Sequence, residues 1–228
     1  MQPYIFPYLG YYQLVNAVDK FLILDDVAYI NKGWINRNRL LINGQAQFFI
    51  MPVEGASQNK AINSLVLLND KKWRIKLEKT IMMAYKKGVG FNDFFPVIKE
   101  ILEFESNHLS EFLVNSIQSI CDYMDIRTQI VCSTSIYNNT QLKGQDRIID
   151  LCLKEETETY LNAWGGKLLY DSQVFKKNGI KLRFLKAELN PYKQIAASLF
   201  VPGLSIIDML MNCPKEFVQQ ELNCFSLV

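Results

Sequence analysis

The sequence predicts an α/β fold with a mostly parallel sheet, flanking helices and a helical insertion in the middle of the chain. Short apolar runs alternate with amphipathic stretches of roughly ten residues near both ends of the 228-residue sequence, which is the pattern of strand–helix–strand units. Between them, residues 70–126 show helical periodicity throughout. A hydrophobic content of 49% supplies a sizeable core and argues against a disordered chain.

The N-terminal third is predicted to hold a helix, a buried strand and a hairpin. Residues 10–18 have the pattern of a short helix, and the apolar run at residues 20–24 ends at Asp25-Asp26. Asn43-Gly44 stands between two strand-like segments and is a strong signal for a two-residue hairpin turn. After a polar loop, residues 62–67 have the composition of another strand.

Three helices are predicted between residues 70 and 126. Asp70 is expected to cap the first of them, whose apolar stripe is Trp73, Leu77, Ile81 and Tyr85. The chain then returns to alternation, with strands expected at 129–133, 159–162 and 180–185 and helices at 145–153, 169–177 and 205–211. We therefore predict an α/β core made of residues 1–69 and 127–228, with residues 70–126 as a helical subdomain.

Bulk composition excludes several classes of protein. The net charge of +2 gives no global reason to bind nucleic acid. The five cysteines are an odd number without C-x-x-C spacing, which suits a reducing cytoplasm better than a disulfide framework or a zinc site. No stretch approaches the roughly 20 apolar residues that span a bilayer, and no signal peptide is evident. We expect a cytoplasmic protein without a bound metal or cofactor.

Five motifs of this chain are long and unusual: Gln2-Pro-Tyr-Ile-Phe-Pro-Tyr-Leu-Gly-Tyr-Tyr-Gln-Leu14, Asp25-Asp-Val-Ala-Tyr29, Trp34-Ile-Asn-Arg-Asn38, Gly165-Gly-Lys-Leu-Leu-Tyr-Asp171 and Leu204-Ser-Ile-Ile-Asp208. Through them nearly the whole chain resembles the WbqC-like protein family. The resemblance implies a role in bacterial surface-polysaccharide (O-antigen) biosynthesis, and some members are described as glycine or other acyl transferases acting on amino sugars. Members of the family usually carry a first strand before the residue that matches Gln2, and we expect this strand to be short or missing here, or the true start to lie upstream of Met1.

The segment Tyr8-Leu-Gly-Tyr11 resembles the His-x-Gly-His motif of the nucleotidyltransferase superfamily, with Tyr at both histidine positions. In that superfamily the glycine allows close approach of a phosphate to the start of a helix. The resemblance implies a related (HUP-like) nucleotide-binding core without adenylylation chemistry. We assign Gln2, Tyr4, Tyr8, Gly10 and Tyr11 to substrate binding, the alternative being a tight loop shaped by Pro7 and Gly10.

Asp25 and Asp26 are the candidate catalytic residues. They directly follow a buried strand, where α/β proteins commonly place their ligands. A carboxylate there can accept the proton that an amine loses when it attacks an acyl carbon. The alternative is a polar cap on the loop that ends the strand.

The loop after this strand is the candidate phosphate site. Arg binds phosphate oxygens with two donors, Asn orients them and Trp stacks on a base or a sugar. We assign Arg37 and Asn38 as principal ligands, and a solvated basic loop is the alternative. The other residues assigned to this site are Lys32, Trp34, Asn36 and Arg39.

Three further features of the sequence each have a functional and a structural interpretation. Asn162, Gly165, Gly166 and Tyr170 surround a strand end where a ligand could approach the backbone, or where the chain simply turns. Ser205 and Asp208 have the spacing of a helix capping box. His108, the only histidine, stands at a predicted helix start, so a Ser-His-Asp or Cys-His mechanism is disfavoured.

The family resemblance, and not the composition, implies N-acyl transfer to the amino group of a nucleotide-linked sugar, with a glycyl or another aminoacyl group as one option for the acyl group. The acyl donor is left open between acyl carrier protein, coenzyme A and aminoacyl-tRNA. Residues 70–87 carry seven basic and two acidic side chains and could dock an acyl carrier protein or tRNA, or be a solvated face. The alternatives are a glycosyl- or nucleotidyl-transferase and a non-catalytic pathway scaffold. A homo-oligomer is also left open.

Overall fold

The structure is a computed structural model that describes residues 1–68, 70–195 and 197–228. Its helices are α1 Leu9–Asn16, α2 Lys72–Tyr85, α3 Phe91–Glu103, α4 Leu109–Tyr123, α5 Gly144–Lys154, α6 Ser172–Lys177, α7 Ile206–Asn212 and α8 Lys215–Glu221. Its strands are β1 Lys20–Leu22, β2 Arg37–Ile42, β3 Gln45–Ile50, β4 Val53–Glu54, β5 Val66–Leu67, β6 Gln129–Val131, β7 Thr159–Ala163, β8 Lys181–Ala187 and β9 Phe225–Leu227. Short 3₁₀ helices are η1 Ile62–Ser64, η2 Thr134–Tyr137 and η3 Trp164–Leu169.

The α/β class is confirmed, but the strands of the described residues form several small sheets where we expected one mostly parallel sheet. Strands β1 and β6 pair in parallel, as do β7 and β8, and β9 joins β8 in antiparallel orientation. Strands β2 and β3 form the hairpin that Asn43-Gly44 predicts, and both turn residues have positive φ, 51° and 76°. Strands β4 and β5 make a further short antiparallel pair.

A groove of about 270 Å³ divides the parallel strands, with residues of β1 on one side and residues of β7 on the other. Met1 lies at one end of this groove. Its nitrogen donates to Leu22 O at 2.7 Å, and Leu24 N donates to Met1 O at 2.9 Å. This is the hydrogen-bond pattern of a parallel bridge to Ile23, so Met1 alone extends the β6–β1 pair toward β7.

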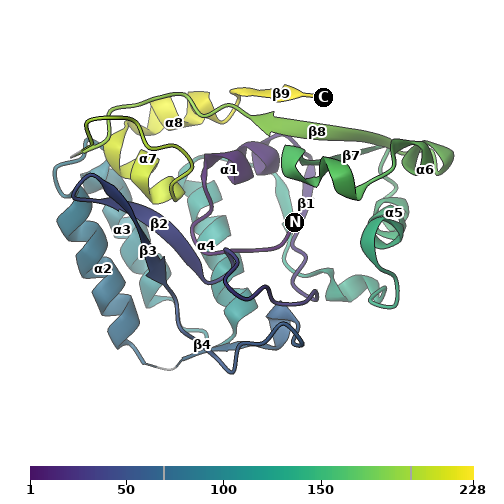
Figure 1. The fold of residues 1–228 in the computed structure, drawn as a ribbon, viewed down its shortest axis with the longest axis horizontal. Coiled ribbons are helices and arrows are strands. Elements are labelled where there is room, and N and C mark those ends of the chain that lie inside the picture. The colour runs from purple at the N-terminus through teal and green to yellow at the C-terminus, as the bar shows by residue number, and fades with distance from the viewer. Residues whose placement is uncertain (69, 196) are drawn as a thin grey trace.

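One hydrophobic core joins the helical middle of the chain to its two ends. Buried side chains of α2, α3 and α4 share this core with α1, β2 and α7, and these elements lie together in the left half of Figure 1. Gly88 and Gly90 connect α2 to α3 against α7. A Cβ at these positions would lie 2.0 Å from Met211 O and 2.1 Å from Leu210 O, so the contact requires glycine. The division into domains stays a prediction.

A second, smaller core holds the β7–β8 region to α5 and α6. Stacked Tyr160 and Phe175, with ring centroids 5.6 Å apart, form its centre. These elements lie at the opposite end of the molecule from α2 (Figure 1). No helix among the described residues combines the length and the apolar character needed to cross a membrane.

Most of the predicted elements occur in the structure, with differences at several places. The expected strand at 62–67 is a turn of 3₁₀ helix followed by two strand residues. The expected helix at 169–177 begins only at Ser172, because the Asp171 side chain accepts from Gln173 N and caps it there. Helix α8 and strand β9 were not predicted, since both are short.

Candidate functional site

The candidate site is a cavity of about 460 Å³ next to the N-terminal loop, called here the N-terminal cavity. Five of the residues assigned from sequence line it: Gln2, Tyr4, Tyr8, Trp34 and Asn38. The remaining lining residues are Met1, Pro3, Ile30, Gly33, Ile35 and Gly203. No Asp or Glu is among the lining residues. The cavity is thus walled mainly by aromatic and apolar groups, as small-molecule sites commonly are.

The side chains of Asn38 and Ser205 hold the N-terminal loop in its shape through hydrogen bonds to its backbone. The Asn38 side chain is 2% exposed and donates to Ile5 O at 3.1 Å and Phe6 O at 2.7 Å. Ser205 Oγ donates to Phe6 O at 2.9 Å. Phe6 has a φ of 44°, which is unfavourable for a side chain of that size. Asn38 was assigned as a phosphate ligand, but its polar atoms are bound to the backbone, so we correct its role to positioning the loop.

Tyr8 forms one wall of the N-terminal cavity and covers the start of α1. A Cβ on Gly10 would lie 2.6 Å from the Tyr8 ring. The close approach predicted at Gly10 therefore exists, but the Tyr8 ring occupies the space that we assigned to a phosphate. Burial raises the pKa of Tyr8 and that of Tyr4, so both phenols stay protonated. Tyr11 is 1% exposed and belongs to the core, where it contacts Tyr4 edge-on.

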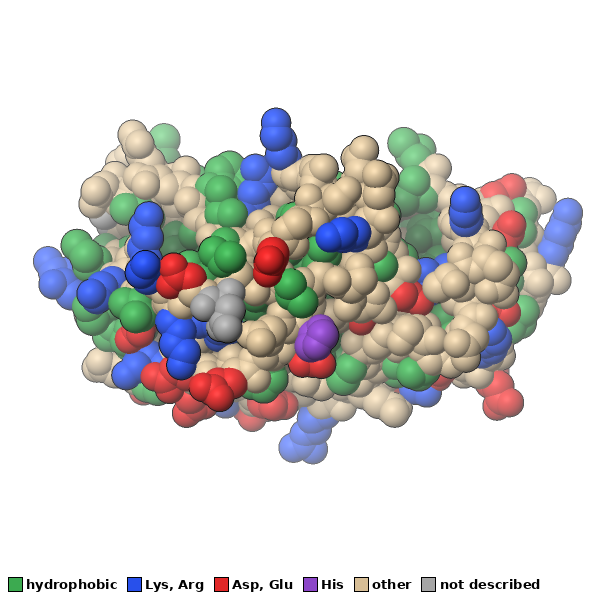
Figure 2. All heavy atoms as spheres, turned by 90° about the horizontal axis from the view of Figure 1, so that it is seen from below, with side chains coloured by type: hydrophobic (Ala, Val, Ile, Leu, Met, Phe, Trp, Pro, Cys, Tyr) green, Lys and Arg blue, Asp and Glu red, His purple; other side chains and the backbone are tan. Residues whose placement is uncertain are grey.

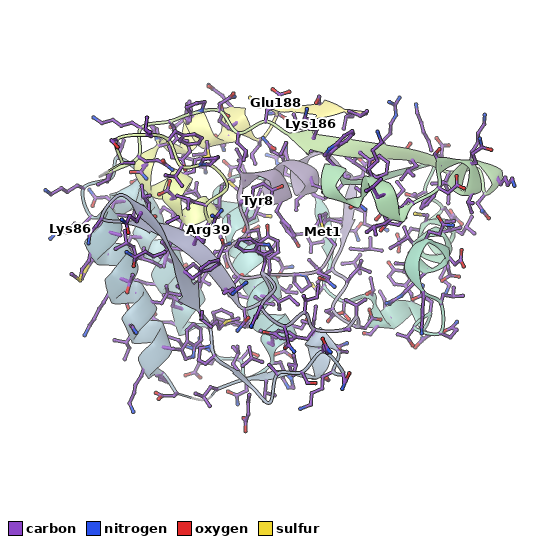
Figure 3. All side chains as sticks on the ribbon, in the orientation of Figure 1. Met1, Tyr8, Arg39, Lys86, Lys186 and Glu188 are labelled. Carbon is purple, nitrogen blue, oxygen red and sulfur yellow. The ribbon has the colours of Figure 1, made fainter. Side chains whose placement is uncertain are left out.

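Arg39 lies beside the N-terminal cavity and retains free donors. Its Nη2 donates to Gly203 O at 3.0 Å, and its Cζ lies 5.6 Å from the Trp34 ring centroid. Its Nε is buried without a hydrogen-bond partner among the described residues. In Figure 3, Tyr8 lies between Arg39 and Met1 near the centre of the molecule.

Arg37, our preferred phosphate ligand, is committed to its own loop. Its Nε donates to Gly33 O at 2.9 Å, its Nη2 donates to Lys32 O, and its Cζ lies 4.7 Å from the Phe48 ring centroid. The structure therefore favours Arg39, first assigned a helper role, as the principal cation. Lys32 is exposed and has a φ of 56°.

Asn36 belongs to the frame of the same loop. Its Oδ1 accepts from Tyr29 OH at 2.7 Å and its Nδ2 donates to Met51 O at 2.8 Å. Both ends of the side chain are thus bound within the protein. Its predicted ligand role is corrected to that of a tie between the loop and the residue that follows β3.

Asp25 and Asp26 lie at the carboxyl ends of the β1–β6 pair, as predicted, but both carboxylates are occupied by partners inside the protein. Asp25 is 3% exposed and accepts from Ser110 Oγ and Ser133 Oγ, each at 2.7 Å. Asp26 accepts from Thr134 Oγ1 at 2.6 Å. Neither residue lines the N-terminal cavity or the groove between β1 and β7. A base role for either one requires it to leave these partners.

Arg147 is the residue in this cluster that the sequence did not reveal. Its Nη2 lies 2.7 and 2.6 Å from the two Asp26 oxygens, and these side chains are 8% and 6% exposed. Its Nε donates to Asn139 Oδ1 at 2.9 Å. One signal in the sequence could have revealed it: Arg147 adjoins Ile148 on α5, a helix whose apolar face points inward. A charged side chain at such a position requires a buried partner.

Asp208, in α7, is the centre of a second buried polar cluster. Its Oδ1 accepts from Tyr85 OH at 2.9 Å, and its Oδ2 accepts from Tyr192 OH at 2.6 Å and Gln194 Nε2 at 2.7 Å. Burial raises the pKa of Asp208, and these hydrogen bonds partly offset the rise. The capping prediction is half correct: Ser205 Oγ accepts from Ile207 N, whereas Asp208 turns inward.

The group after β7 lies apart from the lining of the N-terminal cavity. Asn162 lines the groove between β1 and β7, and a Cβ on Gly166 would lie 2.7 Å from its Nδ2. Tyr170 packs edge-on against Tyr160, with ring centroids 5.8 Å apart. Gly165 is exposed, with open space where a Cβ would be. The structure therefore gives Asn162, Gly166 and Tyr170 local packing contacts.

His108 is exposed at the start of α4, as predicted, and is the purple group on the surface in Figure 2. Burial raises the pKa of the Cys121 thiol to about 12 and that of Cys152 to about 11. Both thiols are therefore poor nucleophiles at neutral pH. Among the described residues, no group of three or more His, Cys, Asp or Glu side chains is arranged to hold a metal ion.

Fold and site together define an α/β protein with an aromatic-walled cavity next to an arginine. The chain belongs to the WbqC-like protein family, whose profile matches residues 2–220, so the family predicted from the motifs is confirmed. The sequence is also 27% identical over 214 residues to the uncharacterized protein Rv1507c of Mycobacterium tuberculosis, an alignment that covers 92% of this chain and 90% of that protein. No solved structure matches the chain.

Proposed function

We propose that this protein is an N-acyltransferase that acts on the amino group of a nucleotide-linked sugar in surface-polysaccharide biosynthesis. One observation carries the proposal: a cavity that is walled by aromatic rings and lined by no Asp or Glu lies beside Arg39, whose guanidinium contacts the lining residues Gly203 and Trp34. A ligand that combines a flat ring or sugar with an anionic group would satisfy both the walls and the arginine.

The dimensions suit part of such a ligand. A volume of about 460 Å³ lies within the ordinary range for small-molecule sites. Tyr4, Tyr8 and Trp34 offer rings on which a base or the apolar face of a sugar can stack. Arg39 offers a diphosphate the Nη donors that are not used by Gly203 O. The absence of carboxylates from the lining favours an anion over a cation.

In the proposed reaction the amine nitrogen of the sugar forms a bond to the acyl carbon of an activated donor. The bond between that carbon and its carrier breaks, and the carrier leaves with the electron pair. The amine proton passes to solvent or to the leaving carrier. An amine with a pKa near that of an α-amino group, about 7.7–8.0, is partly unprotonated at neutral pH, so positioning the two reactants can supply most of the acceleration.

This mechanism assigns Asp25 and Asp26 a smaller role than the sequence suggested. Both carboxylates hold hydroxyl or guanidinium partners within the protein. A general base must instead reach the proton that it accepts. In the proposal, Asp25 and Asp26 stabilise the segment that follows β1, and the loop that carries Trp34 begins after this segment.

A kinship of the core to the nucleotidyltransferase superfamily remains part of the proposal. It is supported by the position of Tyr8 to Tyr11 at the start of α1 and by the parallel pairing of β1 with β6. It implies that a phosphate would approach α1 only after the Tyr8 ring moves. A substitution that shortens Tyr8 should then alter phosphate affinity without disturbing the core.

A direct assay tests the proposed activity. The purified protein is incubated with nucleotide-linked amino sugars and with acyl donors of each kind: acyl coenzyme A, acyl carrier protein and aminoacyl-tRNA. Mass spectrometry then detects the mass added to the sugar. We expect N-acylation that Arg39→Gln and Trp34→Ala reduce at least about tenfold. Binding of the sugar nucleotide without any acylation, whatever the donor, would contradict the enzymatic proposal.

A non-catalytic scaffold for pathway enzymes is the second candidate. The observation that favours it is the apolar surface of η3, where Leu168 is 99% and Leu169 is 70% exposed. Exposed apolar groups in succession commonly mark interaction sites. The scaffold would retain partner enzymes in a pull-down that Leu168→Ser with Leu169→Ser abolishes, and it would show no turnover. A glycosyl- or nucleotidyl-transferase would release free nucleotide or pyrophosphate in the same assay.

A further inference from the structure

We propose that the outer face of α2 docks an acidic amphipathic helix of a partner protein. This outer face consists of Lys72, Lys79 and Lys86 together with Ile75, Met82 and Val89; Lys86 is the residue that caps the end of the helix, and Val89 lies in the turn that follows it. Two side-chain types recur there at the same interval of seven residues. Such an interval is typical of a helix that faces another helix along a seam.

The positions follow from helix geometry. The inner face of α2 is the buried stripe Leu77, Ile81 and Tyr85. At about 100° per residue, Lys79 lies about 200° from Leu77, which puts the lysine row opposite the core. Successive lysines of the row are about 10 Å apart along the axis.

The apolar members of this face are unusually exposed. Ile75 is 49%, Met82 41% and Val89 70% exposed, and the neighbouring Met83 is 74% exposed. Single exposed apolar residues are ordinary, but four on one side of a helix form a contiguous apolar strip. Methionine is frequent at surfaces that bind amphipathic helices, because its flexible side chain adapts to the partner.

The charges specify the sign of the partner. Among the described residues, the ion pairs made by the α2 region lie only near the start of the helix, where Lys71 and Lys72 approach Glu105 and Asp70 at 3.7 Å. Lys79 and Lys86 have no carboxylate within 4.0 Å among the described residues and are free to meet acidic side chains. Figure 2 shows blue, green and red side chains together at the end of the molecule where α2 lies.

Two observations favour a protein helix over nucleic acid. A phosphate backbone is recognised by closely spaced cations and polar groups, whereas here apolar side chains separate the lysines. Arg74, the one arginine of α2, is already used inside the protein: its Nη1 donates to Leu102 O at 2.7 Å and Phe104 O at 2.8 Å. The face therefore offers hydrophobic contact with a positive margin, which is the complement of an acidic amphipathic helix.

The inner side of α2 contacts the strand that carries the candidate cation. Tyr85 OH accepts from Leu41 N at 2.8 Å, and Leu41 is two residues from Arg39 in β2. Figure 3 shows Lys86 at the outer edge of the molecule and Arg39 nearer its centre. A partner on α2 would thus lie one strand away from the N-terminal cavity. Resting on the proposed function, we assign the docked helix to the carrier protein that delivers the acyl group.

The docking is tested by titrating the full-length protein into a fluorescent acidic peptide about three heptads long, with leucine on one face and glutamate on the other. Fluorescence anisotropy measures the dissociation constant. We expect Lys79→Glu with Lys86→Glu to weaken binding at least about tenfold, and Met82→Asp to weaken it as well. The matched control is Lys176→Glu with Lys177→Glu, which makes the same change in net charge at exposed positions of α6, at the opposite end of the molecule (Figure 1).

The outcomes separate this inference from the proposed function. No binding by the wild-type protein, or equal loss in the α6 control, overturns the docking site. Tighter binding of a duplex RNA through the same lysines overturns it in favour of nucleic acid. Peptide binding in a protein without acyltransferase activity keeps the docking site and rejects only the acyl-delivery role. Unchanged unfolding midpoints of the variants confirm that exposed positions were altered without loss of fold.

Discussion

Replacing Asp26 by Asn tests whether this carboxylate is structural or catalytic. The substitution keeps the size of the side chain but removes its charge, and it leaves the Arg147 guanidinium without a counter-ion. In the native protein Arg147 Nη2 lies 2.7 and 2.6 Å from the two carboxylate oxygens. The amide of an Asn would present its own donor to this nitrogen, so one of the two contacts becomes repulsive.

The magnitude follows from burial. The Arg147 and Asp26 side chains are 8% and 6% exposed, so the stranded charge cannot be solvated without opening the structure. Breaking a buried pair from one side typically costs about 3–5 kcal/mol. For a protein of this size, 1 kcal/mol corresponds to about 2–4 °C in Tm. We therefore expect Asp26→Asn to lower the free energy of unfolding by about 3–5 kcal/mol and the Tm by about 6–20 °C.

Urea unfolding followed by circular dichroism measures the effect. The control is Asp26→Leu combined with Arg147→Met, which removes both charges and should be markedly more stable than Asp26→Asn alone. A loss below about 1 kcal/mol in Asp26→Asn, accompanied by loss of acyl transfer, would refute the structural assignment. It would restore Asp26 as the base that the sequence suggested.

Three further predictions concern the frame of the site and are each read from urea unfolding. Asn38→Ala and Ser205→Ala each leave Phe6 O one donor, so the double variant should lose about 1–2 kcal/mol more than the sum of the singles; strict additivity would contradict the shared acceptor. Gly90→Ala puts a Cβ 2.1 Å from Leu210 O and should cost about 3 kcal/mol or more; a neutral effect would contradict the close α7 contact. Burial raises the folded-state pKa of Asp208 above the unfolded value of about 3.9, so the folded state holds this proton more tightly. Its contribution to stability is then present below about pH 4 and is lost as the pH rises through the raised pKa. Asp208→Asn should flatten this decline, and an unchanged pH profile would contradict it.

The sequence predicted the local elements well because each of them depends on nearby residues. The hairpin at Asn43-Gly44 follows from two residues that tolerate positive φ. The stripe of α2 follows from four side chains at a spacing of four residues. The N-terminal cavity was also partly predictable, since its aromatic lining comes largely from two motifs that are unusually rich in Tyr, Trp and Gly.

The partners of the polar side chains could not be predicted, because they come from distant parts of the chain. Asp26 meets Arg147 across 121 positions, and Asn38 meets Phe6 O across 32. Residue type alone gives the capacity for a hydrogen bond and does not tell whether a protein group or a ligand fulfils it. This is why Asn38 and Arg37 resembled ligands of a phosphate, although in the structure their donors are bound to backbone carbonyls.

The central claim is that the N-terminal cavity binds an anionic ligand through Arg39. Isothermal titration of nucleoside diphosphates and nucleotide-linked amino sugars into the wild-type protein, Arg39→Gln and Arg37→Gln tests it most directly. We expect binding of at least one of these ligands, weakened at least about tenfold by Arg39→Gln and much less by Arg37→Gln. Equal affinities in wild type and Arg39→Gln, or no binding of any of these ligands to the wild type, would contradict it.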